Sequence, residues 1–162
     1  MFTLPQLLDE DLQCLNATLS ELITQSEAST AVLTDKAGFR LAEHGDIGSF
    51  DTTTLAALAS GSFLATQAIA QIINEPNFNS VYQQGDKQSM LVCNVDEFTV
   101  LIVIFPATVS VGAVKYYALS AIQAIANQLR IAKARSPEEG MDLAMLNIAD
   151  TPELFKRKDP SL

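Results

Sequence analysis

The chain has 162 residues, of which 48% are hydrophobic, and 19 acidic against 10 basic residues give it a net charge of -9. This length fits one domain with a short extension and is sufficient for a hydrophobic core. The acidic balance argues against nucleic acid and anionic membrane surfaces as partners, although solubility alone also explains most of the charge.

The N-terminus lacks a basic region followed by an apolar run, so we expect no signal peptide. The two cysteines, Cys14 and Cys93, both fall within apolar-patterned segments. We therefore expect both to be free, buried thiols in a reducing compartment. A cytoplasmic location follows from these two expectations.

The first predicted helix carries one narrow apolar stripe at helical spacing, with Pro5 near its start. The run Asp9-Glu10-Asp11 fits the exposed opening of this helix better than a metal site. The stripe consists of Leu8, Leu12, Leu15, Leu19, Leu22 and Ile23.

A β-hairpin is predicted next. Residues Thr30 to Thr34 form a β-branched run, and Asp35-Lys36-Ala37-Gly38 is a turn signal. The second arm runs from Phe39 to His44, and a glycine-containing segment from Gly45 to Ser49 then breaks the chain.

The central predicted helix carries no charge. From Thr52 to Asn74 there is no Asp, Glu, Lys or Arg, whereas a solvated helix normally has charges on its outer face. Asp51 is a good N-cap, and we expect the helix to reach Glu75, where Pro76 stops it. Ser, Thr, Gln and Asn recur along it, so we predict an association surface and not a membrane span.

Two neighbouring arcs of this helix have different side chains. Small residues would let another backbone approach closely, although a tight packing within the chain would also explain them. Gly61 in mid-helix costs roughly 1 kcal/mol relative to Ala, so it calls for a packing reason. The predicted association arc is Ala57, Gly61, Leu64, Ala65, Ala68 and Ile72, and the arc predicted to pack on the sheet is Leu55, Leu58, Ile69 and Ile73.

Three more strands follow. The segment Phe78 to Gln84 is the most polar and is predicted at a sheet edge, where a partner strand often covers it. Ser89 to Val95 is a further strand, and Asp96-Glu97 is predicted at a hairpin tip. Phe98 to Phe105 is apolar nearly throughout, which is typical of a central strand covered on both faces.

A last helix is predicted from Ser110 to Arg135, with basic residues near its end that complement the helix dipole. The order helix-strand-strand-helix-strand-strand-strand-helix predicts an α+β fold, in which a five-stranded antiparallel sheet has helices on both faces. Residues 136–162 form a C-terminal extension, with three basic and six acidic residues. Short amphipathic turns and disorder both fit its composition.

No constellation of residues predicts chemistry. His44 is the single histidine and fits a surface position at a strand end, so no catalytic triad can be built around it. Cys-x-x-Cys, metal-ligand spacings and phosphate-binding glycine loops are all missing from the sequence. We expect no catalytic residue, no metal, no cofactor and no autonomous enzyme.

Several of these segments together resemble the Roadblock family of dynein-light-chain type, and most closely its bacterial MglB branch. They are the hairpin Asp35-Lys36-Ala37-Gly38, the helix start Asp51-Thr52-Thr53-Thr54-Leu55 and the last-helix start Ser110-Val111-Gly112. Asp51 to Gly61 and Val103-Ile104-Phe105 are especially similar. The resemblance covers about residues 4 to 135, so we take 1–135 as a Roadblock-like domain.

The resemblance implies a Roadblock-type α/β/α sandwich that forms a homodimer. In the family the third strands of two protomers join edge to edge, the central helices pair on one face, and the first and third helices cover the other. The residues placed at the dimer edge are Phe78, Ser80, Val81, Tyr82 and Gln84.

The resemblance also implies a regulator of a Ras-like small GTPase of the MglA kind, in bacterial cell polarity and gliding motility. A dimer in this branch binds one GTPase through the paired central helices and stimulates GTP hydrolysis. The contact positions fall at Leu64 and Ala68, next to Gly61 and Ala65. With Ala57 and Ile72 they make up the predicted GTPase-binding surface.

The positions of the basic residues limit how the protein could stimulate GTP hydrolysis. Many activators insert an arginine that accelerates hydrolysis by roughly 10³- to 10⁵-fold. Between Arg40 and Lys87 the chain has no Lys or Arg, so the central helix cannot supply one. We therefore expect activation by ordering the switch loops of the GTPase, with Arg40 or Arg157 as reserve candidates.

Two other hypotheses stay open. A scaffold of the same fold would tether a GTPase or another complex without activating it. A small-ligand sensor is the third hypothesis, although no set of polar residues in the sequence defines a ligand pocket.

Overall fold

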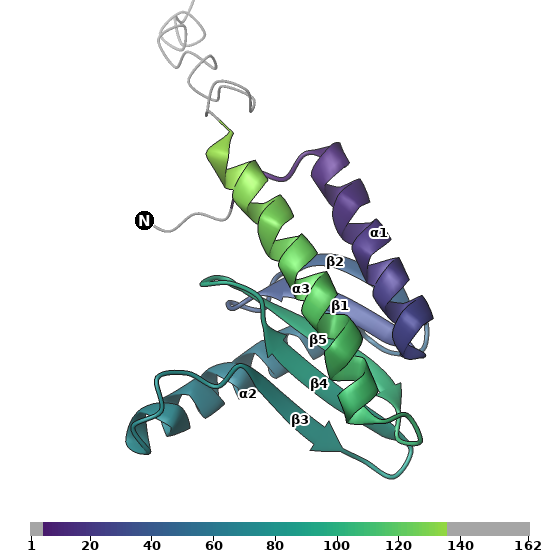
Figure 1. The fold of residues 1–162 in the computed structure, drawn as a ribbon, viewed down its shortest axis with the longest axis vertical. Helices are drawn as coiled ribbons and strands as arrows, with labels where there is room; N and C mark the ends of the chain where they lie inside the picture. Colours follow the sequence, from purple (N-terminus) through teal and green to yellow (C-terminus); the bar gives the residue numbers. More distant parts are fainter. Residues whose placement is uncertain (1–4, 136–162) are drawn as a thin grey trace, which may run out of the picture.

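Three helices and five strands make up residues 5–135, the part of the chain that this computed structural model describes (Figure 1). The elements occur in the predicted order. The predicted extension 136–162 and Arg157 lie outside the described residues. The elements are α1 (Asp9–Ser26), β1 (Thr30–Asp35), β2 (Arg40–Gly45), α2 (Thr52–Ile72), β3 (Ser80–Gln84), β4 (Gln88–Asn94), β5 (Thr99–Pro106) and α3 (Val111–Ala134).

The five strands form one antiparallel sheet in the order β2-β1-β5-β4-β3. The apolar strand β5 is central, as predicted, because both of its faces are covered. The polar strand β3 lies at one edge and β2 lies at the other. Ser80 at the start of β3 pairs with Cys93 near the end of β4, and Gln84 at the end of β3 pairs with Ser89 near the start of β4, so the edge strand runs antiparallel to β4.

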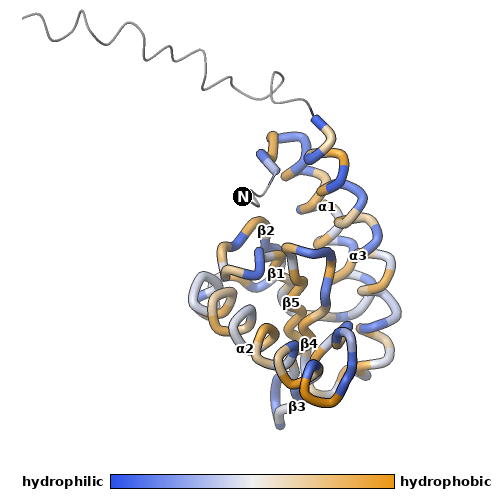
Figure 2. The backbone as a smooth tube through the Cα atoms, turned by 90° about the vertical axis from the view of Figure 1, so that its left-hand side faces the viewer, coloured by the Kyte–Doolittle hydropathy of each residue, from blue (hydrophilic) through white to orange (hydrophobic). Residues whose placement is uncertain are grey.

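The helices cover the two faces unequally. On one face α1 and α3 lie side by side and enclose a core that includes Leu19, Leu101 and Ile125. On the other face α2 is alone, and it encloses a smaller core around Phe63 and Ile102. Figure 1 shows α2 on the side of the sheet opposite α1 and α3, and Figure 2 shows the same layers from a second direction. The predicted layered α+β fold is confirmed.

The acidic opening of α1 is not fully exposed, which corrects our prediction. Asp11 is completely buried and is held by Arg135, by the side-chain amide of Gln128 at 2.7 Å and by the backbone N–H of Leu8 at 2.8 Å. The Arg135 guanidinium beside Asp11 holds the pKa of that carboxyl well below its usual range, against the opposing effect of burial. The acidic run therefore joins α1 to the end of α3.

The two cysteines differ, and the prediction was right for one of them. Cys93 is buried in the core beneath α3, and burial raises the pKa of its thiol to about 11. Cys14 is exposed on the outer side of α1, because it lies off the apolar stripe that packs inward. Neither cysteine forms a disulfide.

Capping hydrogen bonds and backbone conformation explain where α2 begins and ends. The Asp51 side chain accepts hydrogen bonds from the backbone N–H groups of Thr53 and Thr54 at 3.0 and 3.1 Å, which confirms the predicted N-cap. The helix ends at Ile72, before the predicted Glu75, and Asn74 then adopts a left-handed backbone conformation with φ 59°. Asn tolerates this conformation better than most residues, which explains the earlier stop.

Candidate functional site

The inward face of α2 is made of small side chains around one aromatic ring. Ala56, Ala59 and Ser60 are buried against the sheet beside Phe63, and the Ser60 hydroxyl donates a hydrogen bond to the backbone oxygen of Asp35 at 3.1 Å. Small residues allow the helix backbone to lie close to the strands, so the contact is tight without long apolar side chains.

The arc predicted to pack on the sheet does not do so. Leu58, Ile69 and Ile73 are 69%, 51% and 59% exposed, and of the four predicted residues Leu55 alone is half-buried at the margin of the core. The prediction was wrong because α2 is apolar on nearly every side, so hydrophobicity cannot distinguish its inner face. Large apolar side chains with this exposure are typical of an interaction surface.

The predicted association arc is exposed throughout. A Cβ added to Gly61 would meet no atom within 4 Å, so no packing within the described chain explains this glycine. Figure 2 shows apolar residues recurring along α2. The exposed residues of the arc are Ala57, Gly61, Leu64, Ala65, Ala68 and Ile72.

Arg40, one of the reserve arginines, lies at the start of α2. Its guanidinium donates to the Thr52 hydroxyl at 2.5 Å and forms an ion pair with Glu43 at 3.0 Å. These contacts hold Arg40 beside the first turn of the helix. The outward face of α2 beyond it carries no charge along its whole length.

By length and composition, α2 is also the one helix in residues 5–135 that could cross a membrane. However, Ala56, Ala59 and Phe63 form part of a core that α2 shares with strands of the sheet. A helix used in this way is a structural layer of the sandwich, which favours an interaction surface over a span.

The edge strand β3 begins beside the second half of α2. The Gln67 side chain accepts a hydrogen bond from the backbone N–H of Phe78 at 3.1 Å and donates one to its backbone oxygen at 3.0 Å. Phe78, predicted within the edge strand, therefore precedes it, because its backbone groups bond a side chain and not a neighbouring strand. Tyr82 stacks on Phe105 with the ring centroids 6.1 Å apart.

An open apolar groove lies between the N-terminal half of α2 and the sheet. It lies where the first turns of the helix pass over the end of β5 and the start of β4. Leu55 and Ile104 are half-buried there, and the wall residues together are Phe50, Asp51, Thr54, Leu55, Gln88 and Ile104.

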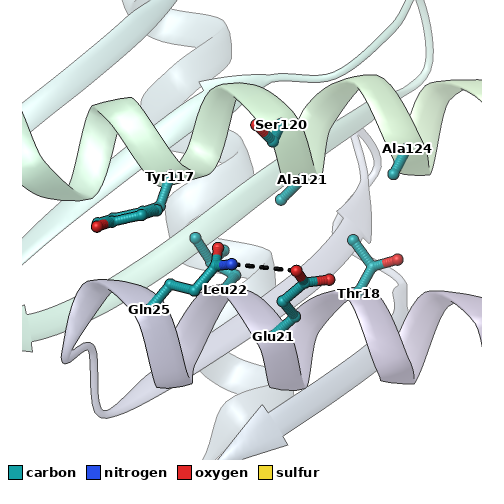
Figure 3. A pocket seen from close by; sticks show the side chains of 8 residues that line it. All are labelled: Thr18, Glu21, Leu22, Gln25, Tyr117, Ser120, Ala121 and Ala124. Carbon is teal, nitrogen blue, oxygen red and sulfur yellow. Dashed lines mark hydrogen bonds between the residues drawn. The ribbon is translucent and has the colours of Figure 1, made fainter.

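A second concavity lies on the opposite face, between α1 and α3 (Figure 3). Its rim is largely polar, and Gln25 donates a hydrogen bond to Glu21 across one helix turn at 3.1 Å. Tyr117 and Ser120 face it from α3. Residues 5–135 hold no group of three or more His, Cys, Asp or Glu side chains that could bind a metal ion.

The Roadblock/LC7 domain family model matches residues 15–105, which is more than half of the chain. The chain belongs to the Roadblock/LC7 family. The match spans α1 from its buried leucines onward, all five strands and α2, so it includes both the exposed helix face and the edge strand.

Solved structures agree with this assignment. MglB from Myxococcus xanthus is 29% identical, with 72% of this chain and 94% of that chain covered and a TM-score of 0.69. The gliding protein MglB from Thermus thermophilus is 27% identical, with 80% and 98% covered and a TM-score of 0.73. A structure described as MglB with tetrameric arrangement is 27% identical, with 82% and 99% covered and a TM-score of 0.75. Among Roadblock proteins, the chain is thus similar to MglB. A search of curated proteins found no match.

Proposed function

We propose that this protein is a homodimeric regulator of a bacterial Ras-like small GTPase of the MglA kind, acting in the cytoplasm in cell polarity and gliding motility. The observation that carries the proposal is the outward face of α2. It is exposed, apolar and free of charge from one end of the helix to the other, and it adjoins an open sheet edge. The protein has no active site of its own in this proposal, and the reaction takes place in the GTPase.

The edge strand supports the homodimer. Within residues 5–135, β3 pairs with β4 on one side and with no strand on the other. An open edge is a template for a further strand, and a second copy of the same strand satisfies its backbone groups symmetrically. Edge-to-edge pairing would place two α2 helices on the same face of one continuous sheet.

The small side chains support contact with a protein backbone or loop. Gly61, Ala65 and Ala68 lie on one exposed strip of α2, opposite the buried Phe63. A partner surface can approach such a strip closely and exclude water, as in the central part of a protein interface. The resemblance assigns the GTPase contact to this strip.

The mechanism follows from the placement of charge. The strip contains no arginine, and Arg40, beside the first turn of α2, is already bonded to Thr52 and Glu43. The protein would therefore accelerate hydrolysis by stabilising the competent arrangement of the GTPase switch loops. Such a shift requires tighter binding to that arrangement than to the others.

GTP turnover by the cognate GTPase, measured with and without saturating protein, tests this function. We expect turnover to increase, and we expect Arg40→Ala to retain the increase because Arg40 inserts nothing into the reaction. Unchanged turnover at saturation would remove the activating role. Loss of activation in Arg40→Ala with intact binding would replace the proposed mechanism by an arginine finger.

The alternative function is a Roadblock scaffold that tethers a GTPase without activating it. The same exposed strip of α2 would serve either function. A scaffold would bind the GDP and GTP forms equally, whereas an activator of this kind prefers the GTP form. Affinities measured by titration against both nucleotide states separate the two.

A further inference from the structure

We infer that this protein binds a small carboxylate with a short aliphatic body, in a pocket on the face of the sheet opposite α2. The pocket lies between α3, the start of β3 and the end of β4. The inference goes beyond the proposed function, because binding of such a ligand requires neither a GTPase nor a second copy of the chain.

The pairing of β3 with β4 builds the floor of this pocket. Ser80 pairs with Cys93, and the backbone N–H of Asn94 donates to the backbone oxygen of Asn79 at 2.8 Å. Lys115 of α3 lines the same space, close enough to Cys93 for its charge to oppose the rise in the pKa of that thiol. The sequence did not indicate the pocket, because its walls come from three separate elements.

The size of the cavity suits a small molecule. Its volume is about 310 Å³, which lies at the lower end of the range of roughly 300–1,000 Å³ found for ligand sites. Such sites combine an apolar wall with a few convergent polar groups, and both are present here.

The polar side chains of this pocket are available to a ligand. Within residues 5–135 the side chains of Asn79, Ser80 and Asn94 form no hydrogen bond with another group of the chain. In the concavity between α1 and α3, by contrast, Gln25 and Glu21 bond to each other (Figure 3). Two carboxamides and a hydroxyl therefore converge on the pocket between α3 and the strands.

The pocket is positively charged although the protein is acidic. No Asp or Glu lines it, and Lys115 forms no ion pair within the described residues. With a net charge of -9 for the chain, this site differs in sign from the protein as a whole. A carboxylate can accept hydrogen bonds from an ammonium, a carboxamide and a hydroxyl alike.

The single cation favours a singly charged ligand. A phosphate monoester carries between about 1.5 and 2 negative charges near neutral pH, whereas a carboxylate carries one. Lys115 is the one Lys or Arg among the residues that line the pocket. We therefore assign the charged group of the ligand as a carboxylate.

The apolar wall continues from Lys115 along α3. Leu119 is 59% exposed and Ile122 is half-buried, and both line the pocket. Lys115 and Leu119 lie one helical turn apart, roughly 6 Å along the axis. A carboxylate bound at Lys115 thus places a chain of a few carbons on Leu119 and Ile122, where it removes apolar surface from water.

Titration of the full, isotope-labelled chain with hexanoate tests the inference through the backbone amide signals. We expect saturable shifts at Asn79, Asn94 and Leu119, and unchanged signals at Ala68 on the opposite face. Hexanol lacks the charge and acetate lacks the aliphatic body. Each should therefore bind at least about tenfold more weakly than hexanoate.

Two pairs of variants test the two halves of the pocket. Lys115→Gln should weaken hexanoate binding about tenfold, because it removes a charge-assisted hydrogen bond. The matched control Lys87→Gln removes the same charge between β3 and β4, outside the pocket, and should leave the affinity unchanged. Leu119→Ser should weaken binding severalfold, whereas Tyr116→Ser, at a more exposed residue of α3 outside the pocket, should not. Circular dichroism establishes that all variants are folded.

Three results would overturn the inference. They are the absence of saturable shifts in the millimolar range, equal weakening by Lys115→Gln and Lys87→Gln, and equal affinity for hexanol and hexanoate. None of them changes the proposed function, which GTP turnover tests separately. Saturable hexanoate binding by a protein that leaves GTP turnover unchanged would contradict the activating role alone.

Discussion

Asp11 and Arg135 lie 124 positions apart in the sequence and form a two-point ion pair, with Nη1 to Oδ2 at 2.5 Å and Nη2 to Oδ1 at 2.8 Å. Asp11 is fully buried, while the Arg135 side chain is 18% exposed and also reaches Glu10 at 3.1 Å. The pair links the first turn of α1 to Arg135, the residue directly after α3. It therefore joins the two helices that cover the same face of the sheet.

Removing the arginine should destabilise the fold. Arg135→Gln leaves the buried Asp11 carboxylate without its cation, and an uncompensated buried charge of this kind costs about 3 kcal/mol. Urea unfolding followed by circular dichroism measures the change. The control Lys133→Gln removes a neighbouring cation that lies over the Phe98 ring 4.2 Å from its centroid, and it should cost less than about 1 kcal/mol. Equal losses in the two variants would contradict the assigned role.

The same pair should make stability depend on pH in the acid range. The folded state lowers the pKa of Asp11, so its carboxylate stabilises the fold above the pKa of the unfolded chain, near 4. This contribution decreases as pH falls below about 4, because the unfolded state then binds more protons than the folded one. Thermal unfolding between pH 2 and 7 should show a shallower dependence for Asp11→Asn than for the wild type. Parallel curves would exclude Asp11 as a contributor.

A charge on the outward strip of α2 should abolish GTPase binding. Ala68→Arg places a guanidinium where the partner would exclude water, and desolvating it without a counter-charge is unfavourable. Ala124→Arg makes the same change at an exposed alanine of α3, on the opposite face. Titration of the GTP-loaded GTPase should show loss of binding in the first variant and wild-type affinity in the second. Wild-type affinity in Ala68→Arg, with the fold intact, would show that the face is wrongly assigned.

Two glycines should respond oppositely to alanine. Gly38 has φ +97°, and a Cβ there would lie 2.9 Å from the Ala57 backbone, so Gly38→Ala should destabilise the fold by about 1–3 kcal/mol. Gly61 is helical with open space around it, so Gly61→Ala should stabilise the fold by up to about 1 kcal/mol. Chemical denaturation of both variants measures the difference, and effects of the same sign would contradict it.

The two cysteines should react at very different rates. Cys14 is exposed, whereas Cys93 is buried and its thiol pKa is raised to about 11, so few thiolates form there near pH 8. A thiol reagent should modify one site per native chain and two after unfolding. Peptide mapping identifies the native site. Fast modification of Cys93 in the native protein would contradict its burial.

Most of the fold could be predicted because each element carries its own pattern. The continuous apolar run of β5 predicted a central strand, and the polar run of β3 predicted an edge. The inner face of α2 could not be predicted. The alanine and serine residues of the inner face are no more hydrophobic than the residues on the other faces of the helix. Leu58 and Ile69 have the side chains of core residues, although they are exposed. For Asp11, the partner lies at the far end of the domain, where no local pattern indicates it.

The two hydrogen bonds between the Gln67 side chain and the Phe78 backbone have a mechanical consequence. They connect α2, the helix proposed to bind the GTPase, to Phe78, which precedes β3, the strand proposed to form the dimer interface. A tilt of α2 must therefore either break both bonds or displace the start of β3. A conformational change in a GTPase bound to α2 of one subunit would thus be transmitted to the other subunit through Gln67.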